Sequence, residues 1–319
     1  MSKELVSVTV ISFNSSSTIL ETLDSILDQS YGSENIELII SDDGSKDNTI
    51  DVINLWLKNN EVFFKRVKLI ANSINSGVPK NCNLAWKAAS CDWIKTIAGD
   101  DILLTNCLEL NMNEVNKKPD VAVMFSLMDG FFVNNLNDKV LKTSYPPKYQ
   151  QKILLSSANE QLKYLRYGDI SGAPTAFINK KKLVEINYAD ERMQLIEDLP
   201  MWYNFVRSGH KLHFFPERTV LYRMDGDSIT NSKSRLINVN FINDLMRVDE
   251  YIINHDLSYK DSFLKFRKYF WPRSVLFVAR AFNNKYGTVA KIMLSTALLM
   301  KPGSISSKLL RLKEKYINE

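Results

Sequence analysis

Residues 6–19, VSVTVISFNSSSTI, begin as an extended apolar segment and then change character. Val6, Val8 and Val10 alternate with small polar residues, which is the pattern of a β-strand. The apolar pattern stops after Ser12, and the serines that follow can cap the helix expected next. A central strand that ends in a polar loop is typical of an open α/β sheet, where ligands bind at the carboxyl ends of the strands.

The same arrangement recurs along the first 126 residues. Short apolar runs rich in Ile and Val lie at residues 36–41, 66–71, 92–98 and 121–126. Residues 17–30 and 46–60, between these runs, have helical length and place apolar side chains on one face. Strands that alternate with such helices predict βαβ units and a mostly parallel, Rossmann-like central sheet flanked by helices, the α/β fold class.

The rest of the chain is less regular. Residues 127–170 predict a loop-rich connection with a hairpin at 129–143, and residues 173–225 predict strands with one helix. Beyond residue 234 the pattern is helical, with expected interruptions at 271–272 and 302–303. We therefore expect a catalytic domain at 1–234, made of halves 1–126 and 127–234, and a helical region at 235–319.

Composition and charge narrow the function classes. The 319 residues carry a net charge of +5, but residues 258–319 hold 13 Lys or Arg against three acidic residues. The three cysteines are scattered without zinc spacing, which suits a reducing cytosol. No secretion signal is expected, and no run reaches the roughly 20 apolar residues of a spanning helix. These features predict a cytoplasmic protein with a basic tail.

Two pairs of adjacent carboxylates follow predicted strands. Asp42-Asp43 ends the second strand and Asp100-Asp101 ends the fourth. Either pair alone could form a turn and cap the next helix, near Lys46 or Leu103. Two pairs at corresponding strand ends favour a binding site instead. Adjacent carboxylates repel each other unless a cation lies nearby, and Mg²⁺ or Mn²⁺ with a nucleotide diphosphate would satisfy them.

Four segments together resemble a known family. VSVTVISFN, ILDQSYGSENIELIISDDGSKDNT, NSGVPKNCNLAW and GDD match, in order and spacing, the inverting family 2 glycosyltransferases of bacterial polysaccharide and O-antigen synthesis. The resemblance is strong over residues 5–130 and weaker to about 230. It implies the GT-A fold and transfer of a sugar from a nucleotide-diphosphate sugar, for which UDP is the expected nucleotide.

The resemblance also implies a donor site. Phe13 matches the position whose ring packs on the base, and Asp43 matches the position that hydrogen-bonds the base. Asp100 corresponds to the residue nearest the ribose or sugar, and Asp101 to the residue that holds the metal. Relatives often carry an arginine where this chain has Cys82, so Lys80 is the replacement candidate. The other expected donor-site residues are Ser12, Asn14, Asp42 and Asn83.

Residues 192–212, RMQLIEDLPMWYNFVRSGHKL, contain the candidate catalytic pair. From residue type alone, Glu197-Asp198 reads as a capping pair at a helix start. Its place after GDD matches the family's ED motif, which implies that Asp198 is the general base and Glu197 the second choice. Trp202 is expected to pack inward on this helix and is also a candidate for the acceptor side.

Two further segments complete the expected site. VLYRMDGDSIT resembles a family segment near the metal, so Arg223 is a candidate for phosphate and Asp225 for the metal, although DGDS is also an ordinary turn sequence. DISGAPTAFINKKKL is expected on the acceptor side. Its candidate residues are Gly172, Pro174 and Thr175.

The implied reaction is metal-assisted direct displacement with one inversion, onto a hydroxyl of a glycan acceptor, for example a lipid-diphosphate-linked oligosaccharide. Two alternatives remain at this stage. One is a non-catalytic nucleotide-sugar or glycan-binding scaffold subunit, and the other is a sugar nucleotidyltransferase, whose usual glycine-rich basic loop is missing here.

The basic tail admits two interpretations. Residues 263–282 interleave Lys and Arg with Phe, Tyr and Trp, as in segments that lie peripherally on an anionic membrane. The other interpretation is a helical subdomain packed on the catalytic domain with a solvated basic face. Nucleic acid is not an expected partner, because residues 1–257 carry a net charge of −5.

Overall fold

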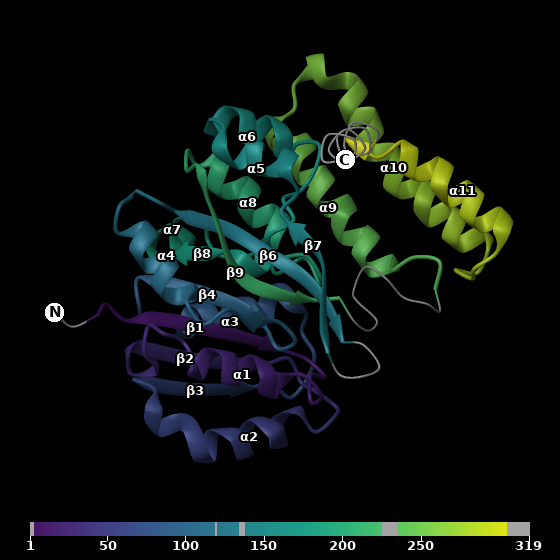
Figure 1. Ribbon diagram of the computed structural model, residues 1–319. Coiled ribbons are helices and arrows are strands. Elements are labelled where there is room, and N and C mark those ends of the chain that lie inside the picture. Colours follow the sequence, from purple (N-terminus) through teal and green to yellow (C-terminus); the bar gives the residue numbers. More distant parts are fainter. Residues whose placement is uncertain (1–2, 119, 134–137, 225–234, 305–319) are drawn as a thin grey trace.

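The computed structural model describes residues 3–118, 120–133, 138–224 and 235–304. Its described strands form one sheet in the order β3-β2-β1-β4-β8-β6-β9-β5, with β7 paired to β6. Figure 1 shows helices on both faces of this sheet and a group of C-terminal helices beside it. The strands are β1 (Val6–Ser12), β2 (Ile36–Asp42), β3 (Arg66–Ala71), β4 (Trp93–Ala98), β5 (Ile102–Leu103), β6 (Val123–Val133), β7 (Lys139–Tyr145), β8 (Phe177–Asn179) and β9 (Leu212–Arg223).

The first four strands are parallel and bring their carboxyl ends to one edge of the sheet. Within β1 and β2, Ser12 pairs with Asp42, and within β2 and β3, Asp42 pairs with Ala71. On the other side of β1, Ile11 pairs with Ala98 of β4. The loops after β1, β2 and β4 therefore start side by side.

Helices cover both faces because β1 and β2 are buried on both. One core cluster joins Val8 and Leu38 to Leu23 of α1, Trp56 of α2 and Met112 of α4. The helices of the first 118 residues are α1 (Ile19–Leu27), α2 (Thr49–Asn60), α3 (Val78–Ala88) and α4 (Cys107–Val115), with short 3-10 turns at Ser33–Asn35 and Glu61–Phe63.

The other face has the larger core. Trp86 of α3, Trp202 and Phe205 of α8, and Val248 of α9 belong to one buried cluster with Ile39 of β2. The elements that supply the rest of this layer are α5 (Lys148–Leu155), α6 (Ala158–Leu165), the 3-10 turn Ala173–Thr175, α7 (Lys180–Glu185) and α8 (Asp198–Arg207).

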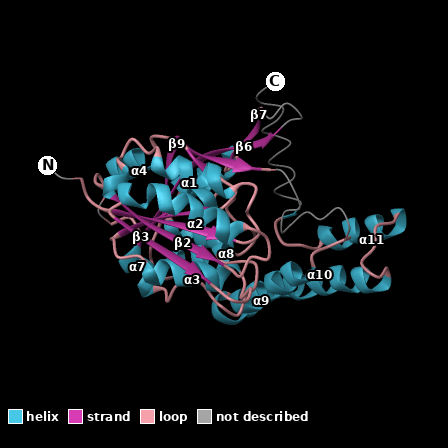
Figure 2. Ribbon diagram, turned by 90° about the horizontal axis from the view of Figure 1, so that it is seen from below, coloured by secondary structure: helices cyan, strands magenta, loops and turns pink. Residues whose placement is uncertain are grey.

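Three long helices end the described chain: α9 (Val239–Asp256), α10 (Ser262–Ala281) and α11 (Thr288–Leu299), with a 3-10 turn at Tyr259–Asp261. Helix α9 joins the large core through Val248 and Ile252. Figure 2 shows α10 and α11 side by side, extending away from the sheet. No helix among the described residues has the length and apolar character needed to cross a membrane.

The mostly parallel α/β fold was predicted correctly, and the described part of the tail, residues 235–304, is mostly helical as expected. The two strands of the hairpin predicted at 129–143 are present, since β6 and β7 pair antiparallel. Residues 127–170 were predicted too loosely, because they include α5 and α6. The interruption expected at 271–272 is absent, because α10 continues through Pro272. The domain boundary at residue 234 stays a prediction, and residues 225–234 lie outside the described ranges.

The predicted helix caps are also corrected. Helix α1 begins at Ile19, and its N-cap residue Thr18 makes no side-chain cap hydrogen bond, so the serines before it form a turn rather than a cap. Helix α2 begins at Thr49 rather than near Lys46. No helix begins near Leu103, because β5 comes first and α4 starts at Cys107.

Candidate active site

A cavity of about 1210 Å³ opens at the carboxyl ends of β1, β2 and β4 and extends to the C-terminal helices. Residues from both predicted carboxylate motifs and from the ED motif line this one space. The sequence-predicted site residues on its wall are Ser12, Phe13, Asp43, Asp100, Asp101, Gly172, Pro174, Glu197 and Asp198.

Phe13 and Asp43 lie where a planar ligand could enter. Phe13 follows β1, and 44% of its surface is exposed although it is a large apolar side chain. Asp43 is buried, and its carboxylate accepts hydrogen bonds from the backbone N–H groups of Ser76 and Gly77 at 2.8 and 2.9 Å. Asp43 therefore holds the 76–77 loop against the cavity, and its contact with a base stays a prediction.

Gly77 explains why this loop can pass so close. Its φ is +95°, and an added Cβ would come within 2.7 Å of the carbonyl oxygen of Gln194. Val78 also donates its N–H to that carbonyl at 2.8 Å. The loop before α3 is thus joined to the segment that leads into the ED motif.

Asp100 and Asp101 share the electrostatic strain that their spacing predicts. Asp101 is 1% exposed, and its Oδ1 accepts the backbone N–H of Arg223 at 2.9 Å. Burial, followed by the neighbouring charge of Asp100, holds the pKa of Asp101 well above its ordinary value. Burial also raises the pKa of Asp100. A cation beside the pair would favour both carboxylates in their charged form.

The donor set suits a hard divalent ion, because carboxylate oxygens are the ligands that Mg²⁺ and Mn²⁺ prefer. Among the described residues, no group of three or more His, Cys, Asp and Glu side chains is arranged to hold a metal by itself. Such an ion usually takes one or two protein carboxylates and completes its shell with water and phosphate oxygens. Asp225, the second predicted ligand, lies outside the described residues.

Glu197 and Asp198 start α8 at the cavity wall. Glu197 occupies the N-cap position and makes no side-chain cap hydrogen bond, while Asp198 accepts the N–H of Leu199 at 2.7 Å. Burial and then the charge of Asp198 raise the pKa of Glu197 to about 8. Burial also raises the pKa of Asp198, although backbone hydrogen bonds oppose the shift. One carboxyl of the pair is therefore protonated near neutral pH.

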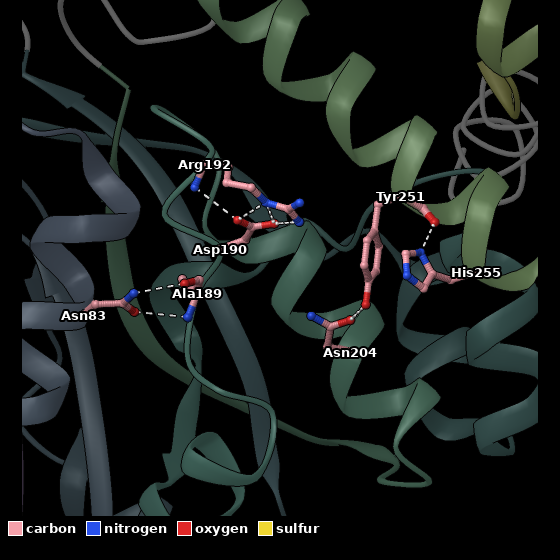
Figure 3. Close-up of polar contacts among 7 residues, drawn as sticks. All are labelled: Asn83, Ala189, Asp190, Arg192, Asn204, Tyr251 and His255. Atoms are coloured by element: carbon pink, nitrogen blue, oxygen red, sulfur yellow. Dashed lines mark hydrogen bonds and ion pairs between the residues drawn. The ribbon is translucent and has the colours of Figure 1, made fainter.

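Hydrogen bonds from α3 and α9 position the segment before this pair. Asn83 donates to the carbonyl of Ala189 at 2.9 Å and accepts its N–H at 3.0 Å (Figure 3). Asp244 of α9 is fully buried, and its Oδ2 accepts the N–H groups of Gln194 and Leu195, each at 2.7 Å.

Helix α8 itself is joined to α9. Figure 3 shows Tyr251 of α9 donating its hydroxyl to the side chain of Asn204 of α8, at 3.0 Å. In the segment between α7 and α8, Asp190 and Arg192 form a separate ion pair at the surface (Figure 3). The C-terminal helices thus help to fix the ED motif.

Several predicted donor-site residues instead hold loops together. Asp42 is fully buried and accepts from the hydroxyls of Ser12 and Ser45. Asn14 accepts the N–H of Lys46 at 2.8 Å and has a positive φ of 51°. Neither lines the cavity.

Lys80 and Asn83 are also outside the cavity wall. Lys80 is exposed on α3, and Asn83 is turned toward Ala189. Arg223 donates from Nε to the carbonyl of Asp100 at 2.8 Å and forms an ion pair with Glu21 at 3.3 Å. Its guanidinium therefore supports the GDD loop. Contact of Arg223 with phosphate, and of Lys80 and Asn83 with the nucleotide sugar, stays a prediction.

Two predicted acceptor residues are core residues. Trp202 is 1% exposed and packs edge-on against Phe125. This agrees with the prediction that it packs inward and gives no support to a contact with the acceptor. Thr175 is fully buried, and its hydroxyl donates to the carbonyl of Gly172 at 2.7 Å. Gly172 and Pro174 remain on the cavity wall.

Sequence reasoning missed several charged residues at or beside the cavity, among them Lys95, Asp169 and Lys301. Lys95 of β4 is fully buried and donates to the carbonyl of Pro174 at 2.6 Å. Its charge partly offsets the burial that raises the pKa of nearby Asp101. A lysine inside the apolar run WIKTIA was the available signal. Asp169 and Lys301 also line the cavity. Asp169 begins the segment DISGAPTAFINKKKL, expected on the acceptor side, but was not among its candidate residues, and nothing in the local sequence marks Lys301.

The model of the family described as "Glycosyl transferase family 2" matches residues 7–181. Among curated relatives, glycosyltransferase GlyG of Streptococcus pneumoniae is 24% identical over 72% of this chain and 74% of its own. The Escherichia coli protein WfaP, a UDP-Glc:alpha-D-GlcNAc-diphosphoundecaprenol beta-1,3-glucosyltransferase, is 26% identical over 72% of this chain and 81% of its own.

Solved structures show the same GT-A fold at low sequence identity. Staphylococcus aureus TarS 1-349 in complex with UDP-GlcNAc has a TM-score of 0.63 and 17% identity, over 95% of this chain and 83% of its own. The mannosyltransferase PcManGT of Pyrobaculum calidifontis, in complex with GDP-Man and Mn²⁺, has a TM-score of 0.60 and 13% identity, over 100% of this chain and 82% of its own.

Proposed function

The chain belongs to glycosyl transferase family 2, and on that premise we propose that it is an inverting enzyme that transfers a sugar from a UDP-sugar to a lipid-diphosphate-linked glycan. The observation that carries the proposal is the single cavity lined by Phe13, Asp43, Asp101 and Asp198. It joins a base-sized aromatic surface, a carboxylate pair for a metal and a carboxyl pair of raised pKa. A transferase needs these three elements in one space.

The roles follow from the chemistry of each group. The acceptor hydroxyl oxygen attacks the anomeric carbon, the bond from that carbon to the diphosphate breaks, and Asp198 takes the hydroxyl proton. The raised pKa of Asp198 makes it a stronger base than an ordinary aspartate. Glu197, protonated near neutral pH, adds no second negative charge. A single displacement inverts the anomeric centre, so an α-linked donor gives a β-glycoside.

Asp101 with Asp100 would hold Mn²⁺ or Mg²⁺, which when bound supplies positive charge to the departing diphosphate. This role is consistent with the raised pKa values of both carboxyls, since each would ionise readily beside a cation. Lys95 of β4 also acts on Asp101 with its positive charge, in the same direction as the metal would.

The proposed setting is the cytoplasmic face of a membrane during O-antigen or capsule synthesis. Its support is an exposed aromatic stripe on α10, made of Phe263, Phe266, Phe270 and Phe277, which recur at helical spacing. Phe266 and Phe270 stack at 5.4 Å. With the basic residues around it, this stripe fits the headgroup region of an anionic bilayer. WfaP, by its name, acts on a diphosphoundecaprenol-linked sugar.

Thermal unfolding with UDP, GDP, dTDP or CMP, each with Mn²⁺, tests the donor assignment. A ligand that binds only the folded protein raises its melting temperature. We expect UDP to raise it, and we expect Asp101→Ala to remove most of the response. A response to GDP alone would contradict the choice of UDP, and no response to any nucleotide would contradict the proposed function.

A further inference from the structure

The cavity continues past the ED motif to a wall that the C-terminal helices supply. Lys268 and Trp271 of α10 and Lys301 after α11 line this end. Apolar residues of α6 and α9 surround them: Leu165, Phe241, Leu245, Val248 and Ile252. This end therefore combines two lysines and the carboxyls of Asp169 and Asp249 with an apolar wall, whereas the other end is acidic at Asp100 and Asp101.

The charges at this end do not all cancel. Asp249 is engaged by both of its neighbours, because Oδ1 pairs with Lys268 and Oδ2 accepts the Trp271 indole N–H at 2.7 Å. Lys301 has no carboxylate within ion-pair distance among the residues that the structure describes. Its ammonium lies 5.2 Å from the centre of the Trp271 ring, and burial lowers its pKa. Within the described part of the chain, the Lys301 ammonium therefore feels the charges of Asp249 and Asp169 only from beyond ion-pair distance, and Lys301 lines the cavity.

The backbone around Lys301 is fixed in place. Arg267 of α10 donates to the carbonyl oxygens of Leu299, Met300 and Lys301, at 2.9, 2.9 and 2.8 Å. Gly303 has a φ of +74°, and an added Cβ would come within 2.8 Å of the Tyr167 carbonyl. The turn after α11 is therefore held between α10 and the 167–169 loop.

Lys301 is also electrostatically connected to the catalytic pair. The pKa of Asp169 is raised by burial and by the charges of Asp198 and Glu197, and it is lowered by the charge of Lys301. Asp169 is thus within electrostatic reach of both groups. Because Asp198, Asp169 and Lys301 line the same cavity, a ligand that spans this part of it can present a hydroxyl to Asp198 and an anionic group to Lys301.

We infer that Lys301, held by Arg267, binds the phosphate group of the acceptor, and that the α6 and α9 residues contact the lipid attached to it. The inference rests on the proposed function. In that function the diphosphate of the donor lies beside the metal at Asp101, so Lys301 is left for the phosphate of the acceptor. An ammonium on a flexible stem is suited to a phosphate as a point charge.

The test is calorimetric titration of the full chain with geranyl diphosphate, geraniol and inorganic diphosphate, in Mn²⁺ and a saturating nucleoside diphosphate that fills the donor site. We expect the dissociation constant of geranyl diphosphate to be at least about tenfold lower than that of geraniol or inorganic diphosphate, because a charge-assisted contact and apolar burial act together. Lys301→Met should remove this advantage, Arg267→Ala should reduce it, and Lys301→Arg should retain most of it. Lys291→Met, on the exposed side of α11, is the matched control and should bind as the wild type.

Equal affinity of Lys301→Met and wild type for geranyl diphosphate would overturn the inference. Inorganic diphosphate that binds as tightly as geranyl diphosphate would overturn its lipid part. A protein that transfers sugar from a UDP-sugar yet shows either result would leave the proposed function standing, whereas absence of nucleotide binding would contradict the proposed function itself.

Discussion

At the scale of single residues, ionisation of the buried Glu197 carboxyl lowers the stability of the folded protein. Its pKa is raised to about 8 by burial and the charge of Asp198, against about 4.5 in the unfolded chain. Between these values the native state binds more protons than the unfolded state, so its contribution to stability falls as pH rises. Charged groups buried at functional sites commonly have this cost.

Glu197→Gln should therefore raise the melting temperature, and the gain over the wild type should be larger at pH 8 than at pH 5. The amide keeps the shape of the side chain and cannot ionise. Scanning calorimetry at both pH values measures the difference. Glu191→Gln, at an exposed position of the same segment, is the control and should show a small gain at most. A uniform effect of Glu197→Gln across pH would contradict the assigned burial of charge.

The pH dependence of transfer should report the same pair. An ordinary aspartate is protonated only below about pH 4. Because burial raises the pKa of Asp198, the base should become protonated, and the transfer rate should fall, at a pH above that value. The limb belongs to the coupled pair rather than to one carboxyl. Measurement of kcat/KM from pH 4 to 9 tests this expectation. A rate that stays constant down to about pH 4, the ordinary range for aspartate, would argue against Asp198 as the base.

At the scale of elements, sequence predicted the strands well and the acceptor side poorly. The runs at β1, β2 and β4 are buried on both faces, so their apolar composition is a strong local signal. Asp42, Asn14 and Asn83 have residue types that suit either ligand binding or loop closure. Only tertiary contacts decide between these roles, and the structure places all three in loop closure.

Lys301 and Asp244 could not have been predicted from local pattern. Lys301 is far from the GDD motif along the chain, and only the packing of α11 on α10 brings it into the cavity. Asp244 lies on one turn of a long amphipathic helix, where an acidic residue is ordinarily solvated. Its burial depends on the two N–H groups of another segment and on the ion pair with Arg247 of the same helix.

Asp244→Ala should lower both stability and kcat. The change leaves the N–H groups of Gln194 and Leu195 without their acceptor, at a cost of about 1–3 kcal/mol for each buried group that stays unsatisfied. It also releases the segment that leads into Glu197 and Asp198. Chemical denaturation and steady-state kinetics measure the two effects.

The matched control is Glu250→Ala on the same helix, which removes a partly exposed ion pair with Arg273 and should cost less than about 1 kcal/mol. Wild-type stability and turnover in Asp244→Ala would show that α9 does not position the ED motif.

At the scale of the whole molecule, charge is distributed unevenly along the chain. Residues 1–257 carry a net charge of −5 and include the proposed donor site, whereas residues 258–319 carry +10. Helix α10 packs on α9 through buried Trp271, and it exposes Phe263, which is 72% exposed, and Phe277, which is 66% exposed; contact of this segment with a membrane stays a prediction.

The protein should bind vesicles that contain anionic lipid and release them at high salt, because lysine and arginine residues near such a surface contribute attraction that salt screens. Phe266→Ser with Phe270→Ser should weaken cosedimentation with these vesicles. Phe63→Ser, at an exposed position of the distant 3-10 turn at Glu61–Phe63, is the control and should have no effect. Equal binding by all three proteins would contradict the proposed membrane face.

The most direct measurement is transfer from a panel of radiolabelled UDP-sugars to a lipid-diphosphate-linked acceptor with Mn²⁺, by the wild type, Asp101→Ala and Asp198→Asn. We predict product with inverted anomeric configuration from the wild type and a loss of about 100-fold or more in kcat for Asp198→Asn. Asp101→Ala should also lose the UDP-dependent rise in melting temperature. Full activity in both variants, or UDP binding without transfer or hydrolysis of any sugar nucleotide, would contradict the assignment of this cavity as a glycosyltransferase active site.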